Sequence, residues 1–115
     1  MMAFDHGLVE RIRDALLRID ERGVREKNVF GGRGFLVGRS AFVIAGSRGL
    51  IVKVAPDEYD AVLSLAGVGP FTPGGSAMST WVVANDDATA DDDDLIEWLR
   101  RGLRGVSVRP SKRRG

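Results

Sequence analysis

The chain contains no cysteine and only one histidine among its 115 residues. Without thiols it can form neither disulfides nor zinc–thiolate sites, and it has no cysteine nucleophile. His6 alone cannot build a histidine-based metal site, and no Gly-x-Ser-x-Gly segment supplies an activated serine. We therefore expect that the protein is not an enzyme and that it binds no cofactor and no metal.

Long apolar runs are also absent. No segment approaches the ~18 apolar residues of a membrane span. Asp5, Glu10 and Arg11 interrupt the start of the chain, where a signal peptide needs an unbroken apolar stretch. We expect a cytoplasmic protein that does not contact membranes. Since 115 residues are the length of one ordinary domain, we assign residues 1–108 to a single domain and residues 109–115 to a disordered basic tail.

The net charge of +1 hides an uneven distribution of charge. Of the 17 basic residues, seven lie from Arg100 onward, where no acidic residue occurs. Residues 1–99 therefore hold ten basic residues and all 16 acidic ones. An acidic body with a basic tail raises the question of nucleic-acid binding. The candidate contacts are the basic residues of the last seven positions, Arg109, Lys112, Arg113 and Arg114.

Hydrophobic periodicity predicts three helices and five strands. Apolar residues spaced three and four apart predict a helix over residues 6–22, and a second helix begins at Pro56 and ends at Gly67. A third helix is expected to begin near Thr89, with its hydroxyl as a cap. Strand-like runs occupy residues 28–37, 40–46, 50–55 and 78–85, with a short edge strand near Phe71.

This order, α-β-β-β-α-β-β-α, predicts an α+β two-layer sandwich in which helices cover one face of an antiparallel sheet. Glycine-containing links between the first three strands favour hairpins. Alternation along residues 50–54 places Ile51 and Lys53 on the face without helices. An exposed apolar residue on such a face is typical of an interface, so we expect a homodimer through Ile51 and Lys53.

The run VFGGRGFLVG at residues 29–38 has two interpretations, a phosphate-binding loop or a tight turn. A P-loop needs a lysine and a following helix, and the dinucleotide fingerprint needs glycine where Val37 stands. In both motifs the helix N-terminus binds the anion, whereas a strand is predicted to follow here. We therefore interpret the glycines as elements of a turn or bulge.

Several stretches resemble the N-terminal domain of the TfoX/Sxy family of bacterial competence regulators. Val29-Phe30-Gly31-Gly32 is similar to the family's Met-Phe-Gly-Gly turn, with valine in place of methionine. Val54-Ala55-Pro56 resembles the Val-Gly-Pro start of the family's second helix, with alanine in place of glycine. The segments GPF, MSTWVVAN and DLIEWLRRGL resemble the closing strand and helix, and the likeness covers residues 8–104.

The resemblance implies a fold similar to that of type III secretion chaperones and a regulatory, non-enzymatic role. Members of the family that regulate competence carry a second, helical domain, which has no counterpart in this sequence, so we expect a stand-alone module. Two classes of function follow. The first is an interaction module that binds a protein partner of unknown identity or a second copy of itself. The alternative is weak, sequence-indifferent nucleic-acid binding through the basic tail.

Deleting residues 109–115 separates these two classes. If the four cations each contact one phosphate of duplex DNA, a plot of log affinity against log salt concentration has a slope of at most about −3.6. Binding through the tail would therefore be largely lost at physiological salt. We expect the deletion to leave the fold intact, to abolish DNA binding and to leave partner binding unchanged, as measured by circular dichroism, filter binding and pull-down. Sequence-specific DNA binding that survives both the deletion and physiological salt would contradict the interaction-module hypothesis.

Overall fold

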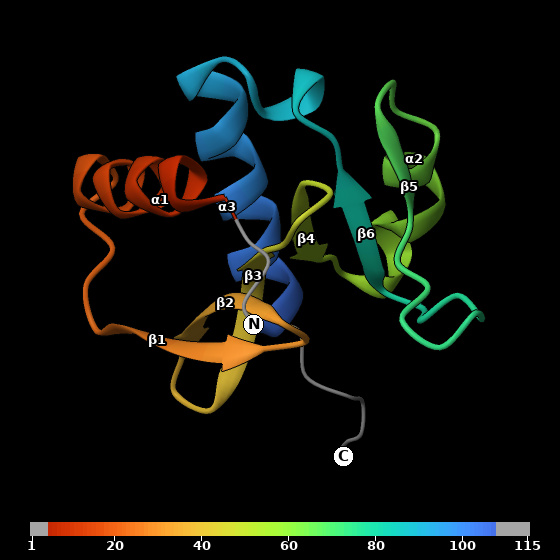
Figure 1. Cartoon of the computed structure of the whole chain (residues 1–115), viewed down its shortest axis with the longest axis horizontal. Helices are drawn as coiled ribbons and strands as arrows, with labels where there is room; N and C mark the ends of the chain where they lie inside the picture. Colours follow the sequence, from red (N-terminus) through yellow and green to blue (C-terminus); the bar gives the residue numbers. More distant parts are fainter. Residues whose placement is uncertain (1–4, 108–115) are drawn as a thin grey trace.

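The computed structural model describes residues 5–107 (Figure 1). Its α-helices are α1 (His6–Arg18), α2 (Tyr59–Leu63) and α3 (Asp92–Ser107), and two short 3₁₀ turns are η1 (Pro56–Glu58) and η2 (Asp87–Thr89). Its strands are β1 (Val24–Val29), β2 (Gly32–Val37), β3 (Ser40–Ala45), β4 (Leu50–Lys53), β5 (Val68–Pro70) and β6 (Trp81–Ala84).

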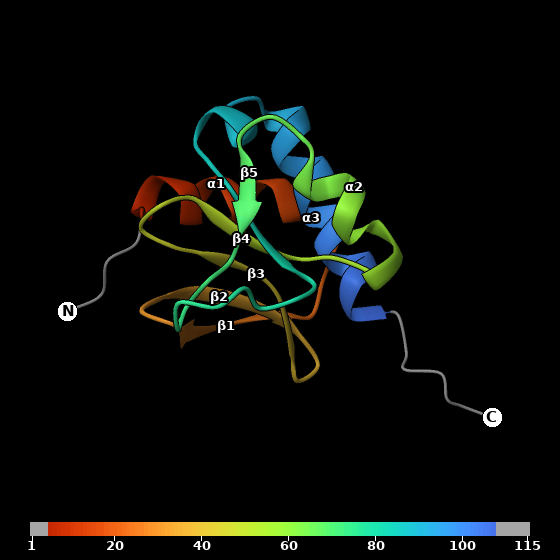
Figure 2. The same cartoon turned by 90° about the vertical axis from the view of Figure 1, so that its right-hand side faces the viewer.

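The strands form one antiparallel sheet in the order β1-β2-β3-β4-β6-β5. Figure 2 shows α1 and α3 together on one side of strands β1, β2 and β3. Side chains of both helices share a single buried core with alternate residues of the strands. The predicted α+β class, with helices packed on an antiparallel sheet, is confirmed.

Helix α1 forms where the sequence predicts it because its start is capped and its apolar residues fall on one side. The Asp5 carboxylate accepts hydrogen bonds from the backbone N–H groups of Gly7 (2.9 Å) and Leu8 (3.2 Å). Leu8, Ile12 and Leu16 are buried against the sheet and α3. These features fix the helix locally and leave its charged side outside.

Helix α3 lies against the backbone of the central strands. A Cβ atom at Gly102 would lie 2.5 Å from the carbonyl oxygen of Phe42 in β3, and one at Gly105 would lie 2.6 Å from that of Lys53 in β4. Both distances are too short for a real side chain, so only glycine permits this approach. The indole N–H of Trp98, on the same helix, donates to the carbonyl of Ala88 (3.0 Å). Trp98 is therefore a satisfied core residue.

A β-bulge lies beneath α3. Phe35 of β2 pairs with Val43, but Leu36 pairs with Ala41, so Phe42 is an extra residue in β3. Both Phe42 and Val43 consequently point into the core on the helix side. A bulge also bends and twists its strand, and this bend shapes the opposite face of the sheet.

The structure divides one predicted strand into two. The run at residues 28–37 is a hairpin in which β1 and β2 meet at a turn at Phe30 and Gly31. Strand β1 begins at Val24, four residues before the predicted run, and helix α1 ends at Arg18. The sequence VREKNV was not predicted as a strand before Asn28 because four of its six residues are polar.

Two further boundaries differ from the predictions. The second helix is a 3₁₀ turn followed by the five-residue α2, and the edge strand β5 lies immediately before Phe71. Thr89 does not cap α3, which begins at Asp92. Its hydroxyl instead lies 3.4 Å from the carbonyl oxygens of Asn85 and Asp86. Local carbonyls compete for this hydroxyl because η2 brings them close.

An ion pair joins α1 to β1. The Arg13 guanidinium donates from Nε and Nη2 to the two carboxylate oxygens of Glu26, each at 2.8 Å. These hydrogen bonds hold the pKa of Glu26 below its ordinary value, although partial burial opposes them. Because the folded pKa is lowered, the pair stabilises the fold at neutral pH, and this contribution is lost as the pH falls through the folded pKa.

The Glu26→Gln variant should therefore lower the melting temperature by a few degrees at pH 7, a small effect since the pair is partly exposed. The difference from wild type should disappear as the pH is lowered below the ordinary range of a glutamate. Thermal denaturation between pH 2 and pH 7 measures both. Glu21→Gln, in the loop before β1, is the matched control. Equal acid profiles for wild type and Glu26→Gln would show that the pair does not stabilise the fold.

Candidate functional site

The segment Val29-Phe30-Gly31-Gly32 forms the tip of the β1–β2 hairpin. Val29 and Gly32 are the last pair of the ladder, and Phe30 and Gly31 are the two residues of the turn. Both have positive φ, 51° for Phe30 and 75° for Gly31, as in a type I′ turn. Strand β2 follows the turn, so the chain does not continue from these glycines into a helix N-terminus.

The sheet curls so that its distant strands approach each other. The ring of Phe30 contacts the ring of Phe71, which follows β5, edge to face with centroids 5.3 Å apart. In a flat sheet, β2 and β5 would be separated by four strand spacings, about 19 Å, which is farther than two phenylalanine side chains reach. The curl is aided by the bulge in β3 and by Gly32, where a Cβ atom would overlap the Ala45 carbonyl oxygen.

The curl creates a hollow on the face of the sheet opposite the helices, here called the Phe30 hollow. Its volume is about 190 Å³. Three apolar side chains line it, those of Phe30, Ile51 and Val83, and the remaining wall is Gly31 and the β3–β4 turn. Phe30 is 58% exposed, although its ring contacts Phe71. The lining residues are Phe30, Gly31, Gly46, Ser47, Arg48, Gly49, Ile51 and Val83.

The prediction that Ile51 is exposed is wrong, because the residue is buried, with only 7% of its surface accessible. Alternation assigned it correctly to the face opposite the helix-side core, but the curl encloses that face, and Ile51 pairs there with Ile44 and Val83. Lys53 lies at the end of β4, where Nζ donates to the Thr80 hydroxyl (2.7 Å) and lies 5.5 Å from the Trp81 ring centroid. Burial lowers the pKa of Lys53.

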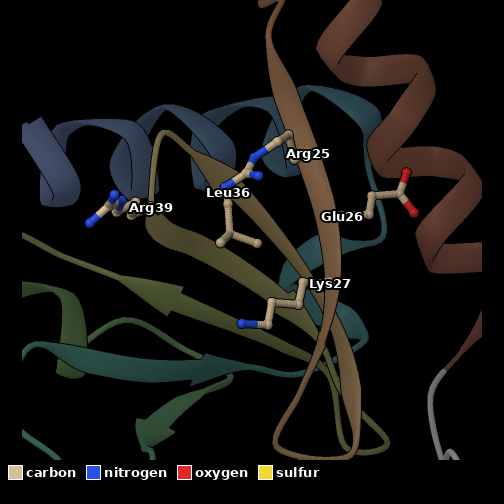
Figure 3. A pocket seen from close by; sticks show the side chains of 5 residues that line it. All are labelled: Arg25, Glu26, Lys27, Leu36 and Arg39. Carbon is tan, nitrogen blue, oxygen red and sulfur yellow. The ribbon is translucent and has the colours of Figure 1, made fainter.

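A second concavity lies at the β1 side of the sheet, with a volume of about 530 Å³. Figure 3 shows Arg25, Lys27 and Arg39 around Leu36, whereas Glu26 points to the other side of β1, toward α1. Nη2 of Arg25 donates a hydrogen bond to the carbonyl oxygen of Gly38 (2.7 Å). Because the Glu26 carboxylate is bound by Arg13, the charge over Leu36 is positive. These four residues, Arg25, Lys27, Leu36 and Arg39, are here called the basic pocket.

The basic pocket and the Phe30 hollow belong to one surface. A continuous row of cross-strand neighbours connects them: Lys27, Gly34, Ile44, Ile51 and Val83. In an antiparallel sheet, residues directly opposite each other point to the same face. The face without helices therefore carries an apolar centre with cations at the β1 edge.

The four predicted nucleic-acid contacts, Arg109, Lys112, Arg113 and Arg114, lie outside the described residues. Within residues 5–107, no three or more His, Asp or Glu side chains come together in a group that could hold a metal ion. None of the helices in that range combines the length and apolar composition of a membrane span.

The sequence prediction did not assign the residues of the basic pocket, or Phe71, to a functional site. Arg25 and Lys27 are separated by one residue, which is the spacing that places two side chains on the same face of a strand. That signal was usable only once VREKNV was known to be a strand. The hairpin register sets Arg25 opposite Leu36. Arg39 follows β2 in the turn before β3 and lines the same pocket.

The fold and its surface define a class of small α+β domain, in which helices cover one face of a curled antiparallel sheet and the other face carries an exposed aromatic side chain and a group of cations. The family follows from comparison with known sequences. A family model of the TfoX N-terminal domain matches residues 17–106, and the chain belongs to that family. Comparisons with curated proteins and with solved structures give no match.

Replacing Gly31 or Gly32 by valine should destabilise the fold. Valine at Gly31 would be forced into the left-handed region, at a cost of about 1–2 kcal/mol. At Gly32 its Cβ would overlap the Ala45 carbonyl oxygen, and the strain should cost about 1–3 kcal/mol. Denaturant unfolding measures both. Gly74→Val, at a position with open space around it, is the control.

Phosphate or nucleotide should leave the wild-type melting temperature unchanged, since the turn precedes a strand. A shift of several degrees with nucleotide, absent in a folded Gly32→Val protein, would instead assign this turn to phosphate binding.

Proposed function

We propose that this TfoX N-terminal domain protein is a non-enzymatic regulatory module of the cytoplasm that binds a protein partner through the Phe30 hollow. The observation that supports the proposal is the conformation and exposure of Phe30. A large aromatic side chain is held at positive φ at the tip of a hairpin, where more than half of it faces solvent.

This arrangement is unfavourable for the isolated chain. A residue with a side chain costs about 1–2 kcal/mol in the left-handed region, and asparagine or glycine is the usual choice in a type I′ turn. The exposed part of the ring contributes no buried area to the fold. Backbone strain at an exposed position is characteristic of functional sites, where the strain holds a group for contact.

The surroundings of Phe30 fit an interface. Aromatic residues are enriched at the centres of protein interfaces, beside pockets that a partner side chain fills. The Phe30 hollow supplies such a pocket, with Ile51 and Val83 as its apolar lining and Arg48 at its edge. The alternative, nucleic-acid binding through residues 109–115, depends on side chains outside the described residues.

The Phe30→Asn variant tests the proposal without unfolding the protein. Relief of the left-handed strain should offset the lost ring contact with Phe71, which is worth about 0.5–1.5 kcal/mol. We expect a melting temperature close to that of wild type and loss of partner capture in a pull-down from nuclease-treated native extract, with the captured protein identified by mass spectrometry.

Leu17→Asn is the matched control, since Leu17 is 77% exposed on α1, on the helix-covered side of the sheet. It should capture the same partner as wild type. Equal capture by Phe30→Asn and wild type would overturn the proposal. Capture that nuclease abolishes would favour the nucleic-acid alternative.

A further inference from the structure

The two edges of the sheet differ in their ability to accept another strand. Strand β5 has three residues and ends at Pro70, which has no N–H to donate. Strand β1 has six residues and no proline, and among residues 5–107 it pairs with β2 alone. Residues 25–28 of β1 are all exposed. The edge of β1 is therefore the one suited to receive an added strand.

The charges of β1 are sorted by face. Arg25 and Lys27 point over Leu36 on the side without helices, and Arg39 adds a third cation there (Figure 3). Glu26 points to the opposite side, where its carboxylate is bound by Arg13 at 2.8 Å. A strand placed beside β1 would thus meet Arg25 and Lys27, and no carboxylate of β1, on the face of the basic pocket.

We propose that β1 binds an extended segment of the partner protein, which adds to the sheet as a further strand and carries acidic residues two positions apart opposite Arg25 and Lys27. This inference rests on the proposed interaction function and names the chemistry of the partner. Side chains two residues apart along a strand are separated by about 6.8 Å and share a face, so the spacing of the two cations is matched by alternate residues of the added strand. Backbone hydrogen bonds supply affinity and the charges supply specificity.

A second copy of the protein does not fit this edge. Two β1 strands from two copies could pair antiparallel, with the helices of both copies on the same face of the joined sheet. Three registers of this pairing are centred near the middle of β1. These registers place Arg25 opposite Arg25, Glu26 opposite Glu26, or Lys27 opposite Lys27 of the second copy. Like charges directly opposite each other are destabilising. The same charges that exclude self-pairing attract an acidic strand.

The preferred probe is a fluorescein-labelled octapeptide of alternating threonine and glutamate, added to the full chain and followed by fluorescence anisotropy. Two control peptides have four threonines followed by four glutamates, and alternating threonine and glutamine. We expect the alternating acidic peptide to bind most tightly and to slow amide hydrogen exchange in residues 25–29. Equal binding of the alternating and blocked acidic peptides would overturn the inference, because attraction of charge alone would then explain it.

Variants of the two cations complete the test. Arg25→Gln/Lys27→Gln should weaken binding of the alternating acidic peptide by at least about fivefold, whereas Arg22→Gln/Arg100→Gln, with the same change in net charge at exposed positions elsewhere, should not. Arg25→Glu/Lys27→Glu should instead bind a peptide of alternating threonine and lysine. Melting temperatures verify that each variant folds. Equal losses in both glutamine pairs would contradict the proposal.

Two further outcomes are decisive. Tighter binding of single-stranded oligothymidine than of the acidic peptide, lost in Arg25→Gln/Lys27→Gln, would assign the basic pocket to nucleic acid and overturn the inference. Absence of peptide binding, with capture of the partner still dependent on Phe30, would refute the added strand and leave the proposed function standing.

Discussion

The sheet curls until an aromatic ring from the β1–β2 turn touches one that follows β5, and the organisation of the exposed face depends on this curl. It encloses Ile51, forms the Phe30 hollow and sets that hollow on the same surface as the basic pocket. The curl has identifiable local causes. The bulge at Phe42 bends β3, and the absence of a side chain at Gly32 lets the hairpin backbone approach Ala45.

The two faces of the sheet have separate roles. On one face, α3 lies against the strand backbone through Gly102 and Gly105, and α1 completes the core, so this face stabilises the fold. The other face holds a strained, exposed Phe30 and the cations of β1, a strand that within residues 5–107 pairs with β2 alone. Ile44 and Ile51 on this second face are also buried, and Phe30, Arg25 and Lys27 are among its exposed groups.

Sequence reasoning succeeded where structure is local and was wrong where it depends on distant contacts. Helices α1 and α3 were predictable because helical periodicity, a capping aspartate and charge at the helix ends are read within one segment. Strand β1 was missed since VREKNV has little apolar pattern and becomes a strand through its pairing with β2. Ile51 was placed on the correct face but called exposed, because alternation identifies a face and says nothing of its curvature. The basic pocket was out of reach, as it joins Arg39 to residues of β1.

The sequence by itself determined the α+β class, the positions of the main helices and the hairpins that join β2 to β3 and β3 to β4. Each of these depends on the conformational preferences of a few neighbouring residues. Only the tertiary structure decided that Phe30 meets Phe71, that Ile51 is enclosed and that three cations surround Leu36 beside the edge strand β1. Those features arise from strand register and from the curl of the sheet. The curl is the sum of small twists over six strands, and it is fixed only when the helices, the bulge and the hairpin pack together.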